Sequence, residues 1–275
     1  MTAAATTLPG TLITVAATGA EHTPTDVPNL PVTLAQLVRT AQDCGRVGAS
    51  VIHVHVRGAD AKPTLDLGLL RETVAALREN TELVVRLSTG GVADDSDADR
   101  LRALDALPDS ASCAMARWEF AVEAHKLMAE REIVPEYEID DLGQLTTLRR
   151  LLDDYGLPAN GRVHVGLVFG VPGGMPGTVE TVSAALRELP VGATFSATGI
   201  DSASIPVMLT TLAARGQLRV GLADTISYGN GEPARDNVQL VARAAGLARI
   251  AQRPPLPGEA ARELLGVRPV VRHDG

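Results

Sequence analysis

The sequence predicts a single-domain (β/α)₈ barrel with additional C-terminal helices, spanning residues 1–275. Eight short apolar segments alternate with helical segments over a length typical of this fold. No G-x-G-x-x-G motif follows the first predicted strand, which disfavours a doubly wound sheet, the main alternative. No linker-like change in composition and no internal repeat divides the chain, so we expect one domain.

The predicted strands are short runs rich in valine, isoleucine and leucine, each followed by turn-forming residues. They cover residues 12–17, 50–57, 83–88, 111–115, 133–139, 163–169, 194–198 and 218–222. The fourth run is the weakest. In the fifth, we expect Pro135 near the start of the strand because proline cannot donate a hydrogen bond inside a sheet.

The predicted helices follow these strands and show apolar residues at helical spacing. They cover residues 33–45, 65–79, 98–107, 120–130, 142–155, 178–189, 205–215, 238–251 and 259–265. The clearest amphipathic pattern is in residues 65–79, where Leu67, Leu70, Val74 and Leu77 share one face.

Composition excludes several classes of function. A net charge of −8 disfavours a nucleic-acid or anionic-membrane partner, which would require a basic surface. The two cysteines, Cys44 and Cys113, lack a C-x-x-C pattern and indicate a reducing compartment. The first ten residues do not resemble a secretory signal, and no apolar run could span a bilayer, so we expect a cytoplasmic protein.

The segment 50–57 carries two histidines, His53 and His55, on a predicted strand. Because side chains alternate between the faces of a strand, both imidazoles point the same way. Such a pair is half of a divalent-metal site that needs further ligands from elsewhere. The alternative is a pair of hydrogen-bonded core histidines.

Other polar residues follow the predicted strands, where barrel enzymes place their chemistry. They are Glu21, His22, Arg57, Ser88, Thr89, Ser112, Glu138, Arg219 and Asp224. Polar groups gathered at one end of a barrel cost desolvation free energy unless they bind something. By contrast, His164 begins its strand and is expected to be structural, and His125 is expected at the surface.

Several motifs together resemble the β-keto acid cleavage enzymes. They are residues 18–21 (TGAE), the His53/His55 strand, residues 88–91 (STGG), 171–175 (VPGGM), 219–222 (RVGL) and 237–241 (NVQLV). The resemblance covers nearly the whole chain in the family's order. It implies a zinc-dependent barrel, a homo-oligomer and specifically a tetramer, that condenses a β-keto acid with acetyl-CoA and yields acetoacetate and a new acyl-CoA.

The resemblance also implies roles for individual residues. His53 and His55 would be zinc ligands, and Ser88 and Ser112 would hold the keto acid. Glu21 would read the far end of the substrate. Asp224 would be the general base, paired with Arg219.

The chain departs from the family pattern at two places. Family members have glutamate where this chain has Ala223, and that glutamate resembles a third zinc ligand. Near strand 4, Ala114 and the bulky pair Arg117 and Trp118 replace small polar residues typical of the family, which makes Arg117 and Trp118 candidates for altered substrate choice. A metal-poor protein that binds its ligands without turnover is therefore an alternative.

A barrel metallohydrolase with an H-x-H strand is a further alternative. In that class the H-x-H lies on the first strand, and further histidines end strands 5 and 6. Here the corresponding segments carry Glu138 and Phe169. Likeness of fold alone is weak support for this function.

Overall fold

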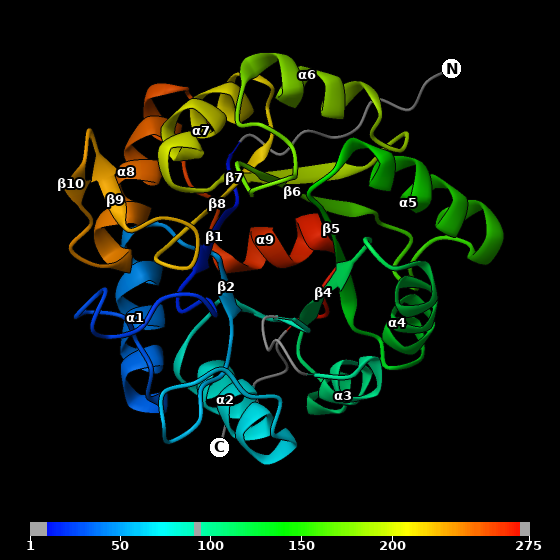
Figure 1. Ribbon diagram of the computed structural model, residues 1–275, viewed down its shortest axis with the longest axis horizontal. Helices are drawn as coiled ribbons and strands as arrows, with labels where there is room; N and C mark the ends of the chain where they lie inside the picture. The colour runs from blue at the N-terminus through cyan, green and yellow to red at the C-terminus, as the bar shows by residue number, and fades with distance from the viewer. Residues whose placement is uncertain (1–9, 91–94, 270–275) are drawn as a thin grey trace.

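Eight parallel strands close into a barrel within residues 10–90 and 95–269, the part of the chain that the computed structural model describes (Figure 1). Strand β1 pairs with both β2 and β8, which closes the sheet. The strands are β1 (Ile13–Ala16), β2 (Val51–Val54), β3 (Val84–Leu87), β4 (Ser110–Ala114), β5 (Val134–Ile139), β6 (His164–Phe169), β7 (Thr194–Gly199) and β8 (Gln217–Val220). The predicted fold is confirmed.

Helices α1 to α8 surround the barrel, and those before β8 connect successive strands, whereas α9 lies across one end of the barrel (Figure 1). The helices are α1 (Leu34–Val47), α2 (Leu67–Asn80), α3 (Asp97–Arg102), α4 (Trp118–Glu130), α5 (Leu142–Tyr155), α6 (Val179–Arg187), α7 (Ser204–Ala213), α8 (Asn237–Ile250) and α9 (Gly258–Leu265). The predicted helix 98–107 is instead a short α3 followed by a 3₁₀ turn, Ala103–Ala106. None of the described helices is long and apolar enough to cross a membrane.

The helix starts follow from local sequence. Thr33 caps α1 in a capping box, because its hydroxyl accepts from the Gln36 amide while the Gln36 side chain accepts from the Thr33 amide. Asp66 and Asp141 cap α2 and α5 in the simpler way, each accepting from a backbone amide of the first turn. These caps fix where each helix leaves the loop that follows a strand.

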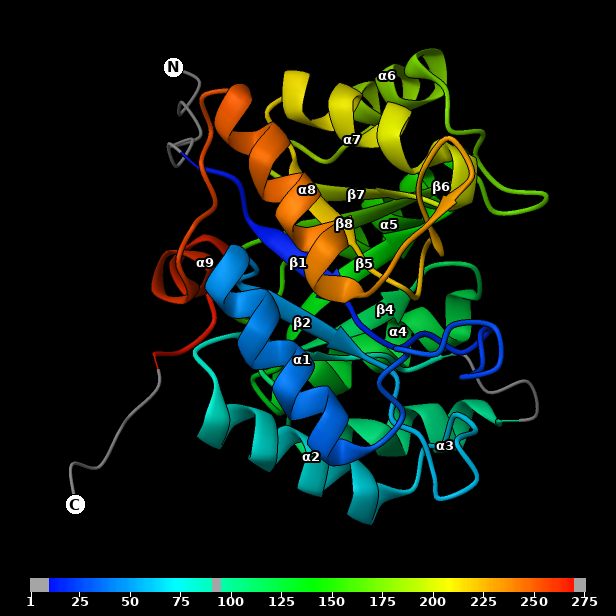
Figure 2. The same ribbon diagram turned by 90° about the vertical axis from the view of Figure 1, so that its left-hand side faces the viewer.

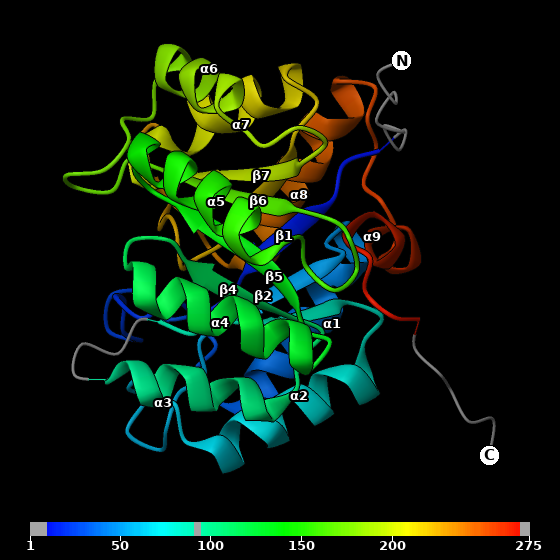
Figure 3. The same cartoon turned by 90° about the vertical axis from the view of Figure 1, so that its right-hand side faces the viewer.

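The apolar core lies mainly between the barrel and its helices. A separate apolar cluster closes the N-terminal end of the barrel, where Leu264 and Leu265 of α9 pack against Leu12, Val51 and Val84. Figures 2 and 3 show α9 at this end, opposite the loops that follow the strands. The C-terminal end is therefore the one that a ligand can enter.

The end of β8 differs from the prediction, because the strand stops at Val220 and does not reach Leu222. Gly221 has φ +154°, and a Cβ there would lie 2.1 Å from the carbonyl oxygen of Ala16. Only glycine allows this close approach to β1. The chain turns here, so the strand alternation does not extend to Ala223, which instead lies against Gly19.

His125 is a second difference. It was expected at the surface, but α4 buries it to 4% exposure and its Nδ1 lies 2.8 Å from the hydroxyl oxygen of Tyr137. The apolar stripe of α4 passes through Ala121, Ala124 and Met128, and His125 shares the buried face with them.

Candidate active site

The two histidines of the H-x-H segment lie next to each other at the C-terminal end of β2. Their ring centroids are 5.5 Å apart, and His53 is almost fully buried. Burial, with Arg219 nearby, lowers the pKa of His53 well below its usual value and that of His55 to about 3. Both imidazoles are therefore neutral at pH 7, the state in which a histidine can be a metal ligand.

An ion-pair network, which we call the upper network, connects β5 and β8 near the C-terminal end of the barrel, where the two histidines also lie. It consists of Arg219, Glu138 and Asp224. The Arg219 guanidinium donates to Asp224 through Nε to Oδ2 at 3.1 Å and through Nη2 to Oδ1 at 2.8 Å. Its third nitrogen, Nη1, donates to Glu138 Oε1 at 2.9 Å. One guanidinium thus fixes two carboxylates, using the planar fork that lysine lacks.

Asp224 is held from a second side. The Thr198 hydroxyl donates to its Oδ2 at 3.1 Å. The Gly221 turn at the end of β8 makes this possible, because the Asp224 amide donates back to the Gly221 carbonyl. Burial raises the pKa of Glu138, and Arg219 opposes that effect.

A second ion-pair network, the lower network, lies deeper in the barrel and consists of Arg86, Glu136 and His164. Arg86 Nη1 lies 2.5 Å from Glu136 Oε1, and His164 Nε2 lies 3.5 Å from the same oxygen. Ser196 donates to that oxygen as well, at 3.0 Å. Burial alone would raise the pKa of Glu136, but Arg86 and His164 outweigh it and hold the pKa below its usual range. The structural role expected for His164 agrees with this position.

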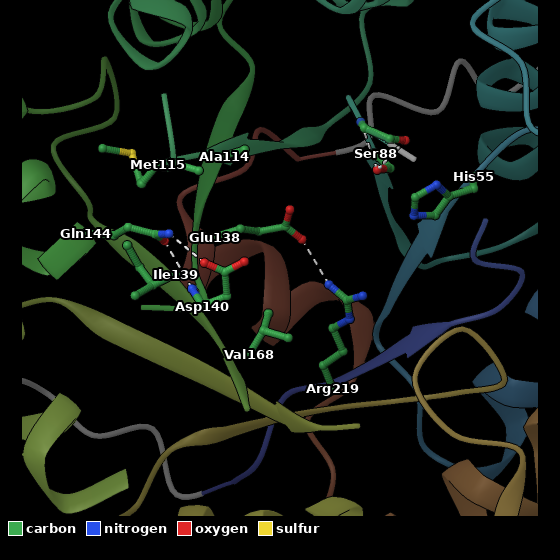
Figure 4. A pocket seen from close by; sticks show the side chains of 12 residues that line it. His55, Ser88, Ala114, Met115, Glu138, Ile139, Asp140, Gln144, Val168 and Arg219 are labelled. Carbon is green, nitrogen blue, oxygen red and sulfur yellow. Dashed lines mark hydrogen bonds and ion pairs between the residues drawn. The ribbon is translucent and has the colours of Figure 1, made fainter. Parts of the chain in front are cut away.

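A cavity of about 250 Å³ opens beside the upper network (Figure 4). Its polar wall includes His55, Ser88, Glu138 and Arg219, and all four belong to the polar residues that the sequence predicts at the ends of the strands. The remaining lining residues include Gly90, Ala114, Met115, Ala116, Ile139, Asp140, Gln144 and Val168. One side of the cavity therefore carries ionisable and hydroxyl groups. The other side is mostly apolar but contains the carboxylate of Asp140 and the amide of Gln144.

Five predicted site residues do not line this cavity: Glu21, His53, Ser112, Arg117 and Asp224. Asp224 is buried behind Arg219, which does line it. Ser112 is buried and accepts a hydrogen bond from the Thr89 amide at 3.1 Å, while the Thr89 hydroxyl donates to the Ser112 carbonyl. These bonds join the ends of β3 and β4, next to Ser88. Glu21 is exposed and does not line the cavity. Gly91, the last residue of the STGG motif, lies outside the described residues.

Arg117 and Trp118 lie at the start of α4. Arg117 pairs with Asp97, and its guanidinium is 5.6 Å from the centroid of the Phe120 ring. Trp118 instead lies under the guanidinium of Arg150 on α5. Neither Arg117 nor Trp118 is among the residues that line the cavity.

The sequence reasoning missed three interior residues, Arg86, Glu136 and Asp140. A signal was available for the glutamate, because Glu136 and Glu138 alternate with Tyr137 and Ile139 on one strand. If the apolar pair faces the helices, both glutamates must face the barrel interior. On β3, Arg86 alternates with Val85 and Leu87 in the same way, so it too faces the barrel interior.

The interior also offers a set of metal ligands. His53, Glu136 and Glu138 each have a ligand atom within 4.8 Å of the others. Among the described residues, His53 Nδ1 and Glu136 Oε2 are buried without a hydrogen-bond partner. One nitrogen and two carboxylate oxygens suit zinc, so the residues present fit a divalent metal.

The profile of the beta-keto acid cleavage enzyme family matches residues 11–267. This chain belongs to that family. A 3-keto-5-aminohexanoate cleavage enzyme of Acetoanaerobium sticklandii is 29% identical, covering 93% of this chain and 98% of its own. A 3-oxoadipate:acetyl-CoA acetyltransferase of Cupriavidus necator is 28% identical, covering 96% and 97%.

The fold is shared with solved structures as well. The apo structure of ObcA has a TM-score of 0.73 at 16% identity, covering 87% of this chain and 66% of the longer ObcA chain. Membership of the family makes the chain an acyltransferase-type enzyme of β-keto acid cleavage, a reaction in which family members use acetyl-CoA as co-substrate. The relatives are named for reactions, which supports turnover over the binding-only alternative.

Proposed function

We propose that this enzyme exchanges acyl groups between a β-keto acid and acetyl-CoA at the cavity beside the upper network, releasing acetoacetate and a new acyl-CoA. The observation that carries this proposal is the Arg219 fork. It holds Asp224 and Glu138 beside a cavity that also presents His55 and Ser88. A carboxylate fixed at two atoms is suited to moving a proton between defined positions.

The proposed reaction begins at the carbon between the carboxyl and ketone groups of the keto acid. Asp224 takes a proton from this carbon, which then attacks the thioester carbonyl of acetyl-CoA, and coenzyme A leaves as its thiolate. That thiolate attacks the original ketone carbon, and the bond between this carbon and the former carbanion centre breaks. The products are the new acyl-CoA and an acetoacetate enolate, to which Asp224 returns the proton.

The other residues act by positioning. Arg219 orients Asp224 through two hydrogen bonds, and Ser88 places a hydroxyl in the cavity wall for the keto acid. Ser112 acts through Thr89, whose amide it holds next to Ser88. Glu21 and Arg117 lie outside the cavity, so any contact with the substrate falls on a part that extends beyond it.

We further propose that His53 and His55 hold zinc, with a carboxylate of Glu136 or Glu138 in place of the ligand that Ala223 lacks. The unpartnered His53 Nδ1 and Glu136 Oε2 support this assignment. A bound zinc ion would act as a Lewis acid on the ketone oxygen. The acid–base work stays with Asp224.

Two further proposals concern the state of the protein. Both described cysteines are buried and free, which fits the reducing cytoplasm. The family resemblance supports a homo-oligomer, specifically a tetramer, which sedimentation analysis of the purified protein would test.

The decisive experiment is to incubate the enzyme with acetyl-CoA and a panel of β-keto acids and to follow acetoacetate. We expect acetoacetate and a new acyl-CoA in equal amounts from at least one acid. Asp224→Asn, which keeps the shape of the side chain, should lower kcat by about 10²- to 10⁴-fold because it removes the base. Elemental analysis of the same preparation tests the metal. A metal-loaded protein that forms no acetoacetate from any acid would favour the binding-only alternative.

A further inference from the structure

Asp140 is the second acid that β5 presents to the cavity. It follows Glu138 by two residues at the end of the strand, and both line the cavity (Figure 4). Residues two apart on an extended chain lie on the same side, roughly 6 to 7 Å apart along it. Asp140 therefore lies one step nearer the barrel opening than Glu138.

Asp140 is held in place by Gln144. The backbone amide of Asp140 donates to Gln144 Oε1 at 3.1 Å, and Gln144 Nε2 donates back to the carboxylate oxygen Oδ1 of Asp140 at 2.5 Å. Its carbonyl accepts from the Met175 amide at 2.7 Å, which ties the β6–α6 loop to this position. A side chain fixed on both its backbone and its carboxylate loses little conformational entropy when it binds a ligand.

The charges of Glu138 and Asp140 are matched differently. Glu138 forms an ion pair with Arg219. No ion pair and no hydrogen bond to Oδ2 is found for Asp140 in the described part of the chain. Its neighbours in the cavity wall include Met115, Ile139 and Val168, which cannot compensate a negative charge. A ligand group that is cationic or donates a hydrogen bond would compensate the charge of Asp140.

Glu21 is the competing acid for this role. It is exposed on the loop after β1, outside the cavity lining. Arg57 Nη2 donates to the carbonyls of Gly19 and His22 on either side of it, which holds this loop in place. A charge in solvent is screened and discriminates weakly between ligands, whereas one in a partly apolar cavity discriminates strongly.

We propose that Asp140, positioned by Gln144, selects keto acids whose tail beyond the ketone carries an ammonium or another hydrogen-bond donor, and disfavours anionic tails. The proposal rests on the proposed function of the cavity. The named relatives act on keto acids of both kinds, since 3-keto-5-aminohexanoate carries an amine in its tail and 3-oxoadipate a carboxylate.

The first test compares kcat/KM for 3-keto-5-aminohexanoate, its uncharged counterpart 3-oxohexanoate and the anionic 3-oxoadipate. We expect the amine to be preferred over the uncharged acid by about tenfold, and 3-oxoadipate to be the poorest of the three. Asp140→Asn, in which Oδ1 can still accept from Gln144, should bring the amine preference close to one, mainly through a higher KM for the amine. The matched variant Glu21→Gln should keep the preference.

A second test does not depend on turnover. Calorimetric titration with 3-hydroxy-5-aminohexanoate and 3-hydroxyhexanoate, which lack the ketone, measures tail recognition alone. Tighter binding of the amine that Asp140→Asn abolishes supports the proposal even if no acetoacetate forms. The proposal is wrong if the wild type binds both probes equally or neither, or if Glu21→Gln removes the preference and Asp140→Asn does not.

Discussion

The upper and lower networks each contain an arginine–glutamate ion pair, but the two pairs differ in their access to solvent. In the lower network the side chains of Arg86 and Glu136 are 0% and 1% exposed. In the upper network those of Arg219 and Glu138 are 12% and 25% exposed. Each network joins an arginine from another strand to a glutamate of β5, and the two glutamates are only two residues apart. One step along β5 therefore separates an ion pair enclosed by protein from one that lines a cavity.

This difference assigns the two networks different roles. A buried arginine–carboxylate pair costs several kcal/mol in desolvation and is maintained only when further hydrogen bonds surround it. In the lower network Ser110 accepts from Arg86 and Ser196 donates to Glu136. In the upper network Arg219 and Glu138 keep part of their surface free for a ligand. We therefore expect the lower network to determine mainly stability and the upper network mainly activity.

The largest expected effect comes from Arg86→Met. Methionine is similar in length to arginine but carries no charge, so Glu136 in the lower network is left charged and unpaired. Such a change typically costs about 3 to 5 kcal/mol in unfolding free energy. Urea denaturation measures the loss. Arg46→Met, at an exposed ion pair with Asp43, is the control and should cost less than about 1 kcal/mol. A loss for Arg86→Met as small as that of the control would contradict the structural role.

Arg219→Lys should have the opposite profile. Lysine keeps the charge but cannot donate to Asp224 through two atoms while also reaching Glu138. We expect kcat to fall by about 100-fold, because misplacing a catalytic group by about 1 Å has an effect of this size. The loss of unfolding free energy should be less than half of that for Arg86→Met. Equal losses in the two variants would show that the networks do not differ in role.

Much of the fold and the Arg219–Asp224 pair of the upper network could be predicted from the sequence. The alternation of strands and helices predicts the barrel, and the residues that follow its strands predict that His55, Ser88, Arg219 and Asp224 lie at one end. Arg219 and Asp224 are five residues apart, so their pairing is local. Local sequence patterns do not show which charged residues form ion pairs across the barrel.

The lower network illustrates that limit. Arg86 and Glu136 are 50 residues apart, and their contact depends on the registers of β3, β4 and β5. The turn after β8 is another case, because the close approach of Gly221 to Ala16 ends a strand that apolar residues alone would continue. Likewise, Asp140 acquires its proposed role only because the cavity opens beside it.

Metal affinity tests whether β5 supplies a ligand from either network. If Glu136 or Glu138 replaces the carboxylate missing at Ala223, then Glu136→Gln or Glu138→Gln should lower zinc affinity by about tenfold or more, since an anionic ligand is lost. Ala223→Glu should raise the affinity if the third position is open. Zinc titration of the three variants beside the wild type measures this. Unchanged affinity in Ala223→Glu together with a loss in one β5 variant would identify the ligand, whereas unchanged affinity in both β5 variants would exclude β5.

The smallest expected effect concerns a buried histidine outside both networks. Burial lowers the pKa of His125 in the folded protein, whereas in the unfolded chain it lies near 6.5. The unfolded state therefore binds more protons as the pH falls below about 6.5, and stability present above that value is lost toward the folded pKa. His125→Asn, which can still bond to Tyr137, should reduce the pH dependence of the unfolding free energy by at most about 1.4 kcal/mol per pH unit. If His125→Asn leaves the slope unchanged, the acid sensitivity of the protein comes from histidines inside the barrel, such as His164 of the lower network.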